Sequence, residues 1–204
     1  MNRQYTLHTS TALADGLRHL FQQLEDRLSL SSPLTAYLAG GMAIHLYTAN
    51  RVTADVDAEF SGKFFMPSDI MAQVTLEDGS SQLVYFDTNY NSTFALMHED
   101  YQQDVMDVDL GLSMVHVKVL SPVDLAVSKI ARLADNDKED IVALVQLGLT
   151  SSEEIEQRAT EALVNYVGNL QMLRLNIQDA VDLAKAAEDK ARQEKKAMEK
   201  WIPK

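Results

Sequence analysis

The sequence predicts an α+β protein, in which a small mixed sheet flanked by helices is followed by a helical C-terminal region. Two runs rich in alternating and β-branched residues, 53–60 and 114–122, predict strands, and Asp78-Gly79 lies between two further alternating runs, as in a β-hairpin. From Pro122 onward, apolar residues recur at helical spacing instead. Strands and helices are therefore largely segregated along the chain, which is the α+β pattern.

The first part, residues 1–120, is expected to form the α/β core. Leucines and Phe21 recur at helical spacing over 11–28, with Ser10 and Thr11 as candidate caps. A predicted strand at 34–39 runs into Gly40-Gly41, and a short helix is expected to follow the glycines.

The second part, residues 121–204, is expected to be helical. It should start at Ser121-Pro122, turn at the polar run 135–140 and stop at Gly148. Ser151 and Glu154 form a capping-box pattern for the next helix. A long helix, charged in its second half, is predicted from about 170 to 200.

The amino-acid composition excludes thiol chemistry and argues against a membrane protein. The chain has 204 residues, of which 46% are hydrophobic, and no cysteine, so disulfides, thiolate metal sites and thiol nucleophiles are excluded. No apolar run approaches the roughly 20 residues that span a bilayer, and the N-terminus lacks the apolar centre of a secretory signal. We therefore expect a cytoplasmic protein with no membrane partner.

Charge is unevenly distributed. The formal net charge is −12, yet residues 185–204 carry seven basic and four acidic residues. The first 184 residues then hold 11 basic and 26 acidic residues, for a net charge of −15. Such an acidic body argues against broad binding of a phosphate backbone, which needs clustered Lys and Arg, whereas it suits a protein that concentrates cations. The basic tail could touch RNA or an acidic partner, or simply be a solvated helix face.

Two carboxylates on one strand point to a metal. Asp55 and Asp57 are two residues apart, so in a strand their side chains share a face. Adjacent like charges resist joint ionisation unless a cation neutralises them, and paired hard oxygen ligands suit Mg²⁺, which also binds substrate phosphates. Gly40 and Gly41 would let the backbone approach a ligand, with the N–H groups of the following helix facing phosphate.

These residues resemble the signature of the nucleotidyltransferase superfamily with the polymerase-beta-like fold. Here the glycine pair is followed by thirteen residues and then by Asp55-Val56-Asp57. The resemblance implies a third carboxylate on a later strand. Asp87, thirty residues after Asp57, matches best, with Asp107 and Asp109 as rivals.

A second segment, 120–141, resembles AbiEii-type nucleotidyltransferases, which are toxin-like proteins of bacterial toxin–antitoxin and phage-defence systems. The resemblance covers about residues 34–148, and it implies that Lys129 contacts nucleotide phosphates and that Asp137 and Asp140 match the acidic positions after it. Tyr85, Tyr90 and Phe94 could stack on a base, although aromatic residues in strands usually serve packing.

The resemblance implies an enzyme that binds a nucleoside triphosphate with Mg²⁺. It would transfer the nucleoside monophosphate to a hydroxyl of RNA, such as a transfer RNA end, or of a protein. Asp55, Asp57 and Asp87 would be the metal ligands and catalytic residues, while Gly40, Gly41, Lys129 and Asp137 would bind the nucleotide. A cognate antitoxin would be a further partner. The alternative is a nucleotidyltransferase-like binding module that has lost turnover and acts through a protein partner.

Overall fold

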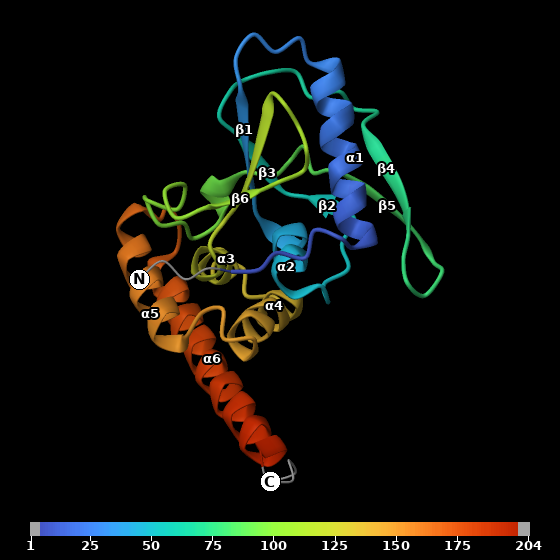
Figure 1. The fold of residues 1–204 in the computed structure, drawn as a ribbon. Coiled ribbons are helices and arrows are strands. Elements are labelled where there is room, and N and C mark those ends of the chain that lie inside the picture. Colours follow the sequence, from blue (N-terminus) through green and yellow to red (C-terminus); the bar gives the residue numbers. More distant parts are fainter. Residues whose placement is uncertain (1–4, 200–204) are drawn as a thin grey trace. The chain divides into compact units, whose positions relative to one another are not determined.

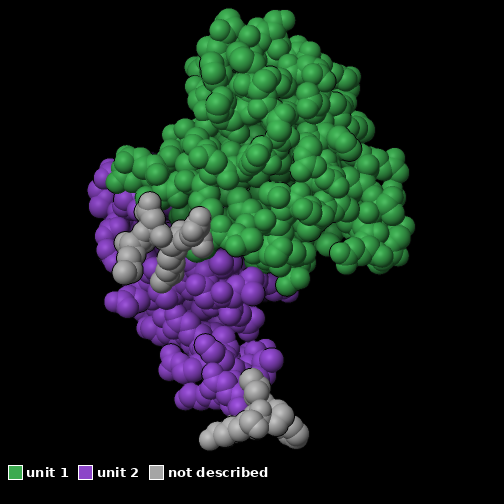
Figure 2. Space-filling model, in the orientation of Figure 1, with its two compact units in different colours: residues 1–91, 100–121 green, residues 92–99, 122–204 purple. Residues whose placement is uncertain are grey.

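The computed structural model describes residues 5–199 and confirms the α+β class (Figure 1). The chain divides into two compact units, coloured separately in Figure 2. The first unit comprises residues 1–91 and 100–121, and the second comprises residues 92–99 and 122–204. The segment 92–99 therefore groups with the helices, whereas the sequence predicted one boundary after residue 120.

The first unit contains two sheets. Its elements in chain order are α1 (Ala12–Arg27), β1 (Leu34–Leu38), α2 (Gly40–Thr48), β2 (Asp55–Val56), β3 (Ala58–Phe60), β4 (Met71–Thr75), β5 (Ser81–Phe86), β6 (Met106–Val108) and β7 (Val115–Val119). The four-stranded sheet has the order β3-β1-β7-β6, with β1 parallel to β7 and the other pairs antiparallel. In the three-stranded sheet, β2-β5-β4, β2 runs parallel to β5 and β4 runs antiparallel to it.

Helix α1 packs against β4 and β5 and buries one face there (Figure 1). Thr11 is its N-cap, as predicted, and accepts a hydrogen bond from the Ala14 N–H. Phe21 of α1 contacts Phe86 of β5 edge to face, with ring centroids 5.1 Å apart, and also lies 6.5 Å from Phe60 of β3. These three rings form a core shared by the helix and both sheets.

One continuous stretch of chain, residues 55–60, serves both sheets. At its start, β2 pairs with β5, and the Asp87 N–H donates to the Val56 carbonyl at 3.0 Å. Further on, β3 pairs with β1, and the Ala39 N–H donates to the Asp57 carbonyl at 2.9 Å. Asp57 is thus the residue at which the chain leaves one sheet and enters the other.

The second unit is helical. Its elements are η1 (Ser92–Phe94), α3 (Pro122–Ser128), α4 (Asp135–Gln146), α5 (Ser152–Ala162), η2 (Leu163–Asn165) and α6 (Leu170–Glu199). The predicted capping box of α5 is confirmed, because the Ser151 hydroxyl accepts from the Glu154 N–H while the Glu154 carboxylate accepts from the Ser151 N–H. The long helix α6 packs against α4 and α5 through Ile177, Val181 and neighbouring alanines.

The predicted polar turn at 135–140 is wrong. These residues form the first turns of α4, and the break between helices lies earlier, between Ser128 and Asp135. Asp135 and Asp137 lie in the first turn, where carboxylates meet the positive end of the helix dipole. The acidic run therefore starts a helix rather than ending one.

Candidate active site

The glycine pair lies directly against the acidic strand. Gly40 has a φ of +62°, and a Cβ placed on it would lie 1.6 Å from Oδ2 of Asp57. A Cβ on Gly41 would lie 2.9 Å from the Thr53 hydroxyl oxygen. A side chain on Gly40 would collide with the Asp57 carboxylate, and one on Gly41 would collide with Thr53, which precedes the acidic strand.

The same glycines begin α2, a helix of nine residues. Ala39 precedes the helix and makes no side-chain capping bond, so no cap from that residue covers the first N–H groups. The Asp57 carboxylate, beside Gly40, meets the positive end of the helix dipole. The N-terminus of a helix can receive an anion, and here the Asp57 carboxylate lies beside it and both glycines are buried.

Strand register brings the three predicted carboxylates to one face. Asp55 is opposite Tyr85 on β5, and Val56 is opposite Phe86. One position further along the two parallel strands are Asp57 and Asp87. Because Val56 is buried while Asp55 is exposed, the acids face away from the core.

The rival carboxylates lie elsewhere. Asp107 is on β6, at the far edge of the four-stranded sheet, and its Oδ1 pairs with Lys118 Nζ at 2.6 Å. Three strand spacings separate β6 from β3, or about 14 Å. Asp109 accepts a hydrogen bond from the Gly111 N–H in a local turn. Sheet order and register therefore favour Asp87 as the neighbour of Asp57.

The Asp87 side chain is partly engaged already. Its Oδ1 accepts a hydrogen bond from the Asn89 N–H at 2.8 Å, which forms an Asx-turn. Within residues 5–199, no three His, Asp or Glu side chains gather closely enough to surround one metal ion. Two neighbouring carboxylates remain, which is what Mg²⁺ commonly takes from a protein, because water and substrate phosphates complete its shell.

Two tyrosines flank the acids. A hydrogen bond to Asp55, together with its charge, raises the pKa of Tyr85, its partner in register. Burial, and then the nearby charges of Asp57 and Glu59, raise the pKa of Tyr90. Each phenol therefore stays protonated and can donate a hydrogen bond toward the acids at neutral pH.

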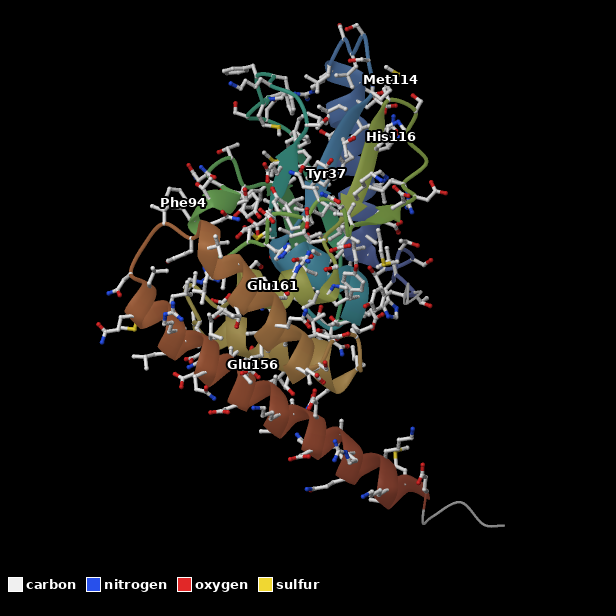
Figure 3. The ribbon with its side chains drawn as sticks, turned by 90° about the vertical axis from the view of Figure 1, so that its left-hand side faces the viewer. Tyr37, Phe94, Met114, His116, Glu156 and Glu161 are labelled. Carbon is white, nitrogen blue, oxygen red and sulfur yellow. The ribbon has the colours of Figure 1, made fainter. Side chains whose placement is uncertain are left out.

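Sequence analysis missed Glu59, a further carboxylate on this face. It is opposite Tyr37 in the β1–β3 pair, and its Oε2 accepts from the Tyr101 hydroxyl at 2.5 Å. In Figure 3, Tyr37 on β1 and His116 on β7 lie on this open side of the four-stranded sheet. The signal was present, since Asp55, Asp57 and Glu59 continue one alternation, but Glu59 follows the part of the pattern that the resemblance covers.

Lys129 and Asp137 lie in the second unit, where they form an internal ion cluster. The Lys129 ammonium is 3.0 Å from Asp140 and 3.6 Å from Asp137, and all three side chains are at least nine-tenths buried. Arg132 binds both Asp137 oxygens at 2.7 Å. Burial raises the pKa of Asp137, but Arg132, the Ala134 N–H and Lys129 outweigh that effect and hold the pKa below its usual value.

The two sheets, the acidic strand between them and the glycine pair that starts a helix define an α+β protein with a glycine turn beside paired carboxylates. The chain belongs to the family described as nucleotidyltransferase of unknown function (DUF6036), whose family model matches residues 15–190. The match extends from α1 into α6, so it includes the acidic strand, the glycines and the Lys129 cluster. No curated protein and no solved structure matches the chain significantly.

No helix among the described residues is both long enough and apolar enough to cross a bilayer.

Proposed function

We propose that the chain is a Mg²⁺-dependent nucleotidyltransferase that moves a nucleoside monophosphate from a nucleoside triphosphate to a hydroxyl of RNA or protein. The position of Asp57 carries the proposal. Its carboxylate touches Gly40 at the start of α2, and its neighbours in register are Asp55 and Asp87. A phosphate held at the helix N-terminus would therefore lie beside the acids that must act on it.

The phosphate-binding part consists of Gly40 and Gly41. Their N–H groups lie at the start of α2, beside Asp57, and would bind the β- and γ-phosphates. Because neither glycine has a side chain, the Asp57 carboxylate and Thr53 approach the buried backbone closely, as a phosphate would. Since the acidic strand is fixed in both sheets, the phosphates and the carboxylates would be held in one geometry, and such positioning supplies much of catalysis in phosphoryl transfer.

The donor atoms fit Mg²⁺, because they are hard carboxylate oxygens on one open strand face beside a phosphate-binding turn. Asp55 and Asp57 would hold the metal, and Asp87 would complete the acceptor side. When bound, Mg²⁺ would neutralise the charge of the triphosphate and of the paired carboxylates. Tyr85 would orient Asp55 by a hydrogen bond, and Tyr90 lies near the charge of Asp57.

In the reaction, the acceptor hydroxyl oxygen attacks the α-phosphorus, and the bond from that phosphorus to the bridging oxygen of pyrophosphate breaks. Pyrophosphate leaves with that electron pair. Asp87 would take up the hydroxyl proton through the carboxylate oxygen that is not in the Asx-turn. No covalent enzyme intermediate is needed, which agrees with a chain that has no cysteine.

We extend the proposal to Lys129, as the cation that offsets phosphate charge, and to Asp137, which helps to fix it. The support is the resemblance of segment 120–141, and in the structure two carboxylates hold the Lys129 ammonium. To reach a phosphate, Lys129 would have to exchange at least one of these pairs. Arg132 would then keep Asp137 compensated.

The biological setting that we propose is a bacterial toxin–antitoxin or phage-defence system in the cytoplasm, with ATP among the candidate substrates and a cognate antitoxin as partner. It rests on the likeness to AbiEii-type proteins alone. Co-expression of the chain with its genomic neighbour would test it, because an antitoxin should relieve growth inhibition that Asp57→Asn also relieves.

The direct test is transfer of label from α-³²P-labelled nucleoside triphosphates, with Mg²⁺, to transfer RNA and to protein. Asp57→Asn should lower transfer by at least about a hundredfold, because it removes one of the paired charges. Asp107→Asn, a matched control on the distant strand β6, should retain most activity. If both variants behave like wild type, or if wild type binds no nucleotide, the proposal is wrong.

The alternative is a catalytically inactive binding module, and one observation favours it. One carboxylate oxygen of Asp87 already accepts a hydrogen bond in an Asx-turn. Asp87 does not complete a group of three acids, and no such group occurs in the part of the chain that the structure describes. Under this alternative, ATP would bind in calorimetry, yet no acceptor would be labelled. Asp87→Asn would then leave every measured property unchanged.

A further inference from the structure

We propose that the acceptor is a hydroxyl-bearing protein segment with an apolar centre and basic flanks, which docks on the outer face of the β4–β5 hairpin. This inference rests on the proposed function, and it selects protein over RNA as the acceptor. We call this surface the hairpin face. It consists of the outward side chains of β4 and β5, namely Met71, Gln73, Thr75, Ser81, Leu83 and Tyr85.

The hairpin face is exposed and partly apolar. Burial alternates along both strands, so Val74, Val84 and Phe86 point to the core under α1 while the six outward residues face away from it. Met71, Leu83 and Tyr85 are 48%, 47% and 43% exposed. Three large apolar side chains in register on one small face are more than scattered surface residues, and Met and Tyr are enriched in protein interfaces.

The hairpin face is continuous with the candidate active site. Met71 is opposite Tyr85 across the hairpin, and Tyr85 is opposite Asp55 on β2, so the three side chains form one row across the sheet. Tyr85 also hydrogen-bonds Asp55. Two residues beyond Tyr85 on the same strand side is Asp87, the carboxylate assigned to the acceptor hydroxyl. A segment lying along β5 would thus deliver its hydroxyl to the acids.

The charges on and around the hairpin face favour a peptide over a nucleic acid as its partner. None of the six residues of the hairpin face is charged. Asp55 and Asp87 lie at one end, and the hairpin turn places the exposed residues Glu77 and Asp78 at the other. A nucleic acid backbone needs Lys or Arg to neutralise its phosphates, and the hairpin face supplies none. A peptide with an apolar centre and basic ends is complementary to this pattern.

The size of the hairpin face suits a short peptide. Ser81 and Tyr85 are four residues apart on β5, or about 13 Å at the rise of a β-strand. An extended segment of about five residues would cover the face and place basic side chains at both acidic ends. A hydroxyl on the residue of this segment nearest Tyr85 would then lie at the Asp87 end, beside the site where phosphate is proposed to bind.

The test offers wild type three acceptors with α-³²P-labelled nucleoside triphosphates and Mg²⁺. Two are synthetic peptide pools with Ser, Thr or Tyr in an apolar centre, one flanked by Lys and Arg and the other by Asp and Glu. The third is total transfer RNA. We expect the basic-flanked pool to take up at least about tenfold more label than the acidic-flanked pool, and transfer RNA to take up little.

Leu83→Lys should reduce labelling of the basic-flanked pool by at least about tenfold, because it removes an apolar contact and adds a repelling charge. Leu83→Met should stay within about twofold of wild type, since it keeps size and polarity. Phe65→Lys is the matched control, because Phe65 is 90% exposed in the same unit but lies outside the hairpin face. Unfolding midpoints show that each variant folds, and Met71→Lys replaces Leu83→Lys if the latter does not.

Several outcomes overturn the inference. These are label in transfer RNA with both peptide pools blank, equal labelling of the two pools, an equal loss in Phe65→Lys, and a Leu83→Lys variant as active as wild type. If transfer RNA alone is labelled, the acceptor inference fails and the proposed function stands; if ATP binds to wild type with Mg²⁺ but no acceptor is labelled, both fail and the inactive binding module replaces them. If ATP does not bind, the proposed function fails first.

Discussion

Gly40 is held in the left-handed region of backbone conformation, with the Asp57 carboxylate occupying the space where a side chain would begin. Two costs would follow from adding a methyl group there. The backbone strain alone is about 1–2 kcal/mol, and the clash with Asp57 would add to it or push the carboxylate away. Gly79 shares the positive φ, at +82°, but a Cβ placed on it would have nothing within 4 Å.

The comparison gives a prediction. Gly40→Ala should lower the free energy of unfolding by more than Gly79→Ala, which should lower it by only about 1–2 kcal/mol. Label transfer should be lost in Gly40→Ala and retained in Gly79→Ala. Urea unfolding and the transfer assay measure both effects. Equal destabilisation by the two substitutions would show that the contact with Asp57 does not constrain Gly40.

His45 connects three parts of the first unit. Its Nδ1–H donates to the Arg51 carbonyl at 2.7 Å, and its Nε2, 2.7 Å from the Thr11 hydroxyl, accepts from it. Burial, assisted by the charge of His8 and opposed by the Arg51 carbonyl, lowers the pKa of His45 below 6.5. The native state therefore holds the neutral imidazole.

A pH dependence of stability follows, and its sign is fixed by linkage. The unfolded chain binds a proton at His45 more readily, so the stabilisation is complete above pH 6.5 and is lost as pH falls through the lower native pKa. We expect the free energy of unfolding to fall from about pH 7.5 to about pH 5.5, and His45→Gln to reduce that slope. His19→Asn, at an exposed position of α1, should leave the slope intact; a slope unchanged by His45→Gln would exclude His45 as its origin.

At the scale of elements, the Lys129 cluster holds the break between α3 and α4. Lys129 lies just after α3, whereas Asp137 and Asp140 lie on α4. Truncating Lys129 would remove the cation that lies 3.0 Å from Asp140 and 3.6 Å from Asp137, while Arg132 would still pair with Asp137. Breaking a buried pair in this way commonly costs about 3–5 kcal/mol.

Lys129→Ala should therefore destabilise the protein by about 3 kcal/mol or more, in addition to any effect on transfer. Lys138→Ala is the matched control, since Lys138 pairs with the exposed Asp135 at 3.6 Å, and it should cost less than about 0.5 kcal/mol. Denaturant unfolding separates the two. A Lys129→Ala variant as stable as wild type would show that the cluster is not structural.

Glu25 ties the end of α1 to the start of β7. Its carboxylate accepts hydrogen bonds from the N–H groups of Ser113, Met114 and Val115, at 3.1, 2.7 and 2.8 Å, and from the Ser113 hydroxyl. Burial would raise the pKa of Glu25, but these bonds, led by that from Met114, lower it to about 2.

The stabilisation from Glu25 should be complete above pH 4.5 and lost as pH falls toward 2. Because the group is only half-buried, we expect Glu25→Gln to cost only about 1 kcal/mol at neutral pH. The variant should also lose less stability than wild type between about pH 5 and about pH 3. Glu77→Gln, in the exposed hairpin turn, should match wild type at both pH values.

Elements with local signals were predictable. Thr11 caps α1, Asp78-Gly79 makes the hairpin turn, and Ser151 with Glu154 opens α5, because each signal lies within a few residues of the structure that it forms. Strand β6, of three residues, was not predicted because it depends on pairing with β7. The acidic run 135–140 misled because the same carboxylates suit a turn and a helix start.

At the scale of the whole molecule, sequence spacing placed the glycine pair near Asp55 and Asp57, and it favoured Asp87 as the third carboxylate without excluding Asp107 and Asp109. Asp87 follows β5 in the three-stranded sheet, whereas Asp107 is on β6 in the four-stranded sheet. Which sheet a strand joins depends on pairing between segments that are far apart in the sequence. The partners of Lys129 were equally hidden, because Asp137 and Asp140 reach it only once α4 has formed.

Net charge gives a prediction for the whole chain. At −12, with most basic excess in the last 20 residues, the protein should bind transfer RNA weakly and with strong salt dependence. Filter binding at low and physiological salt should show the weak complex lost at the higher salt. Replacing Lys195 and Lys196 by Glu should abolish the binding seen at low salt. Tight, salt-insensitive binding would contradict the prediction that the acidic body disfavours RNA.

The sequence of residues 55–60, which belong to both sheets, is more constrained by the fold than the sequence of the β4–β5 hairpin tip. Residues 55–60 are held by β1 on one side and β5 on the other, so they tolerate little change without disturbing Asp57. The tip of the β4–β5 hairpin is joined to the rest of the fold at one end only. The hairpin sequence, and with it the acceptor, could therefore differ between relatives that keep the same candidate active site.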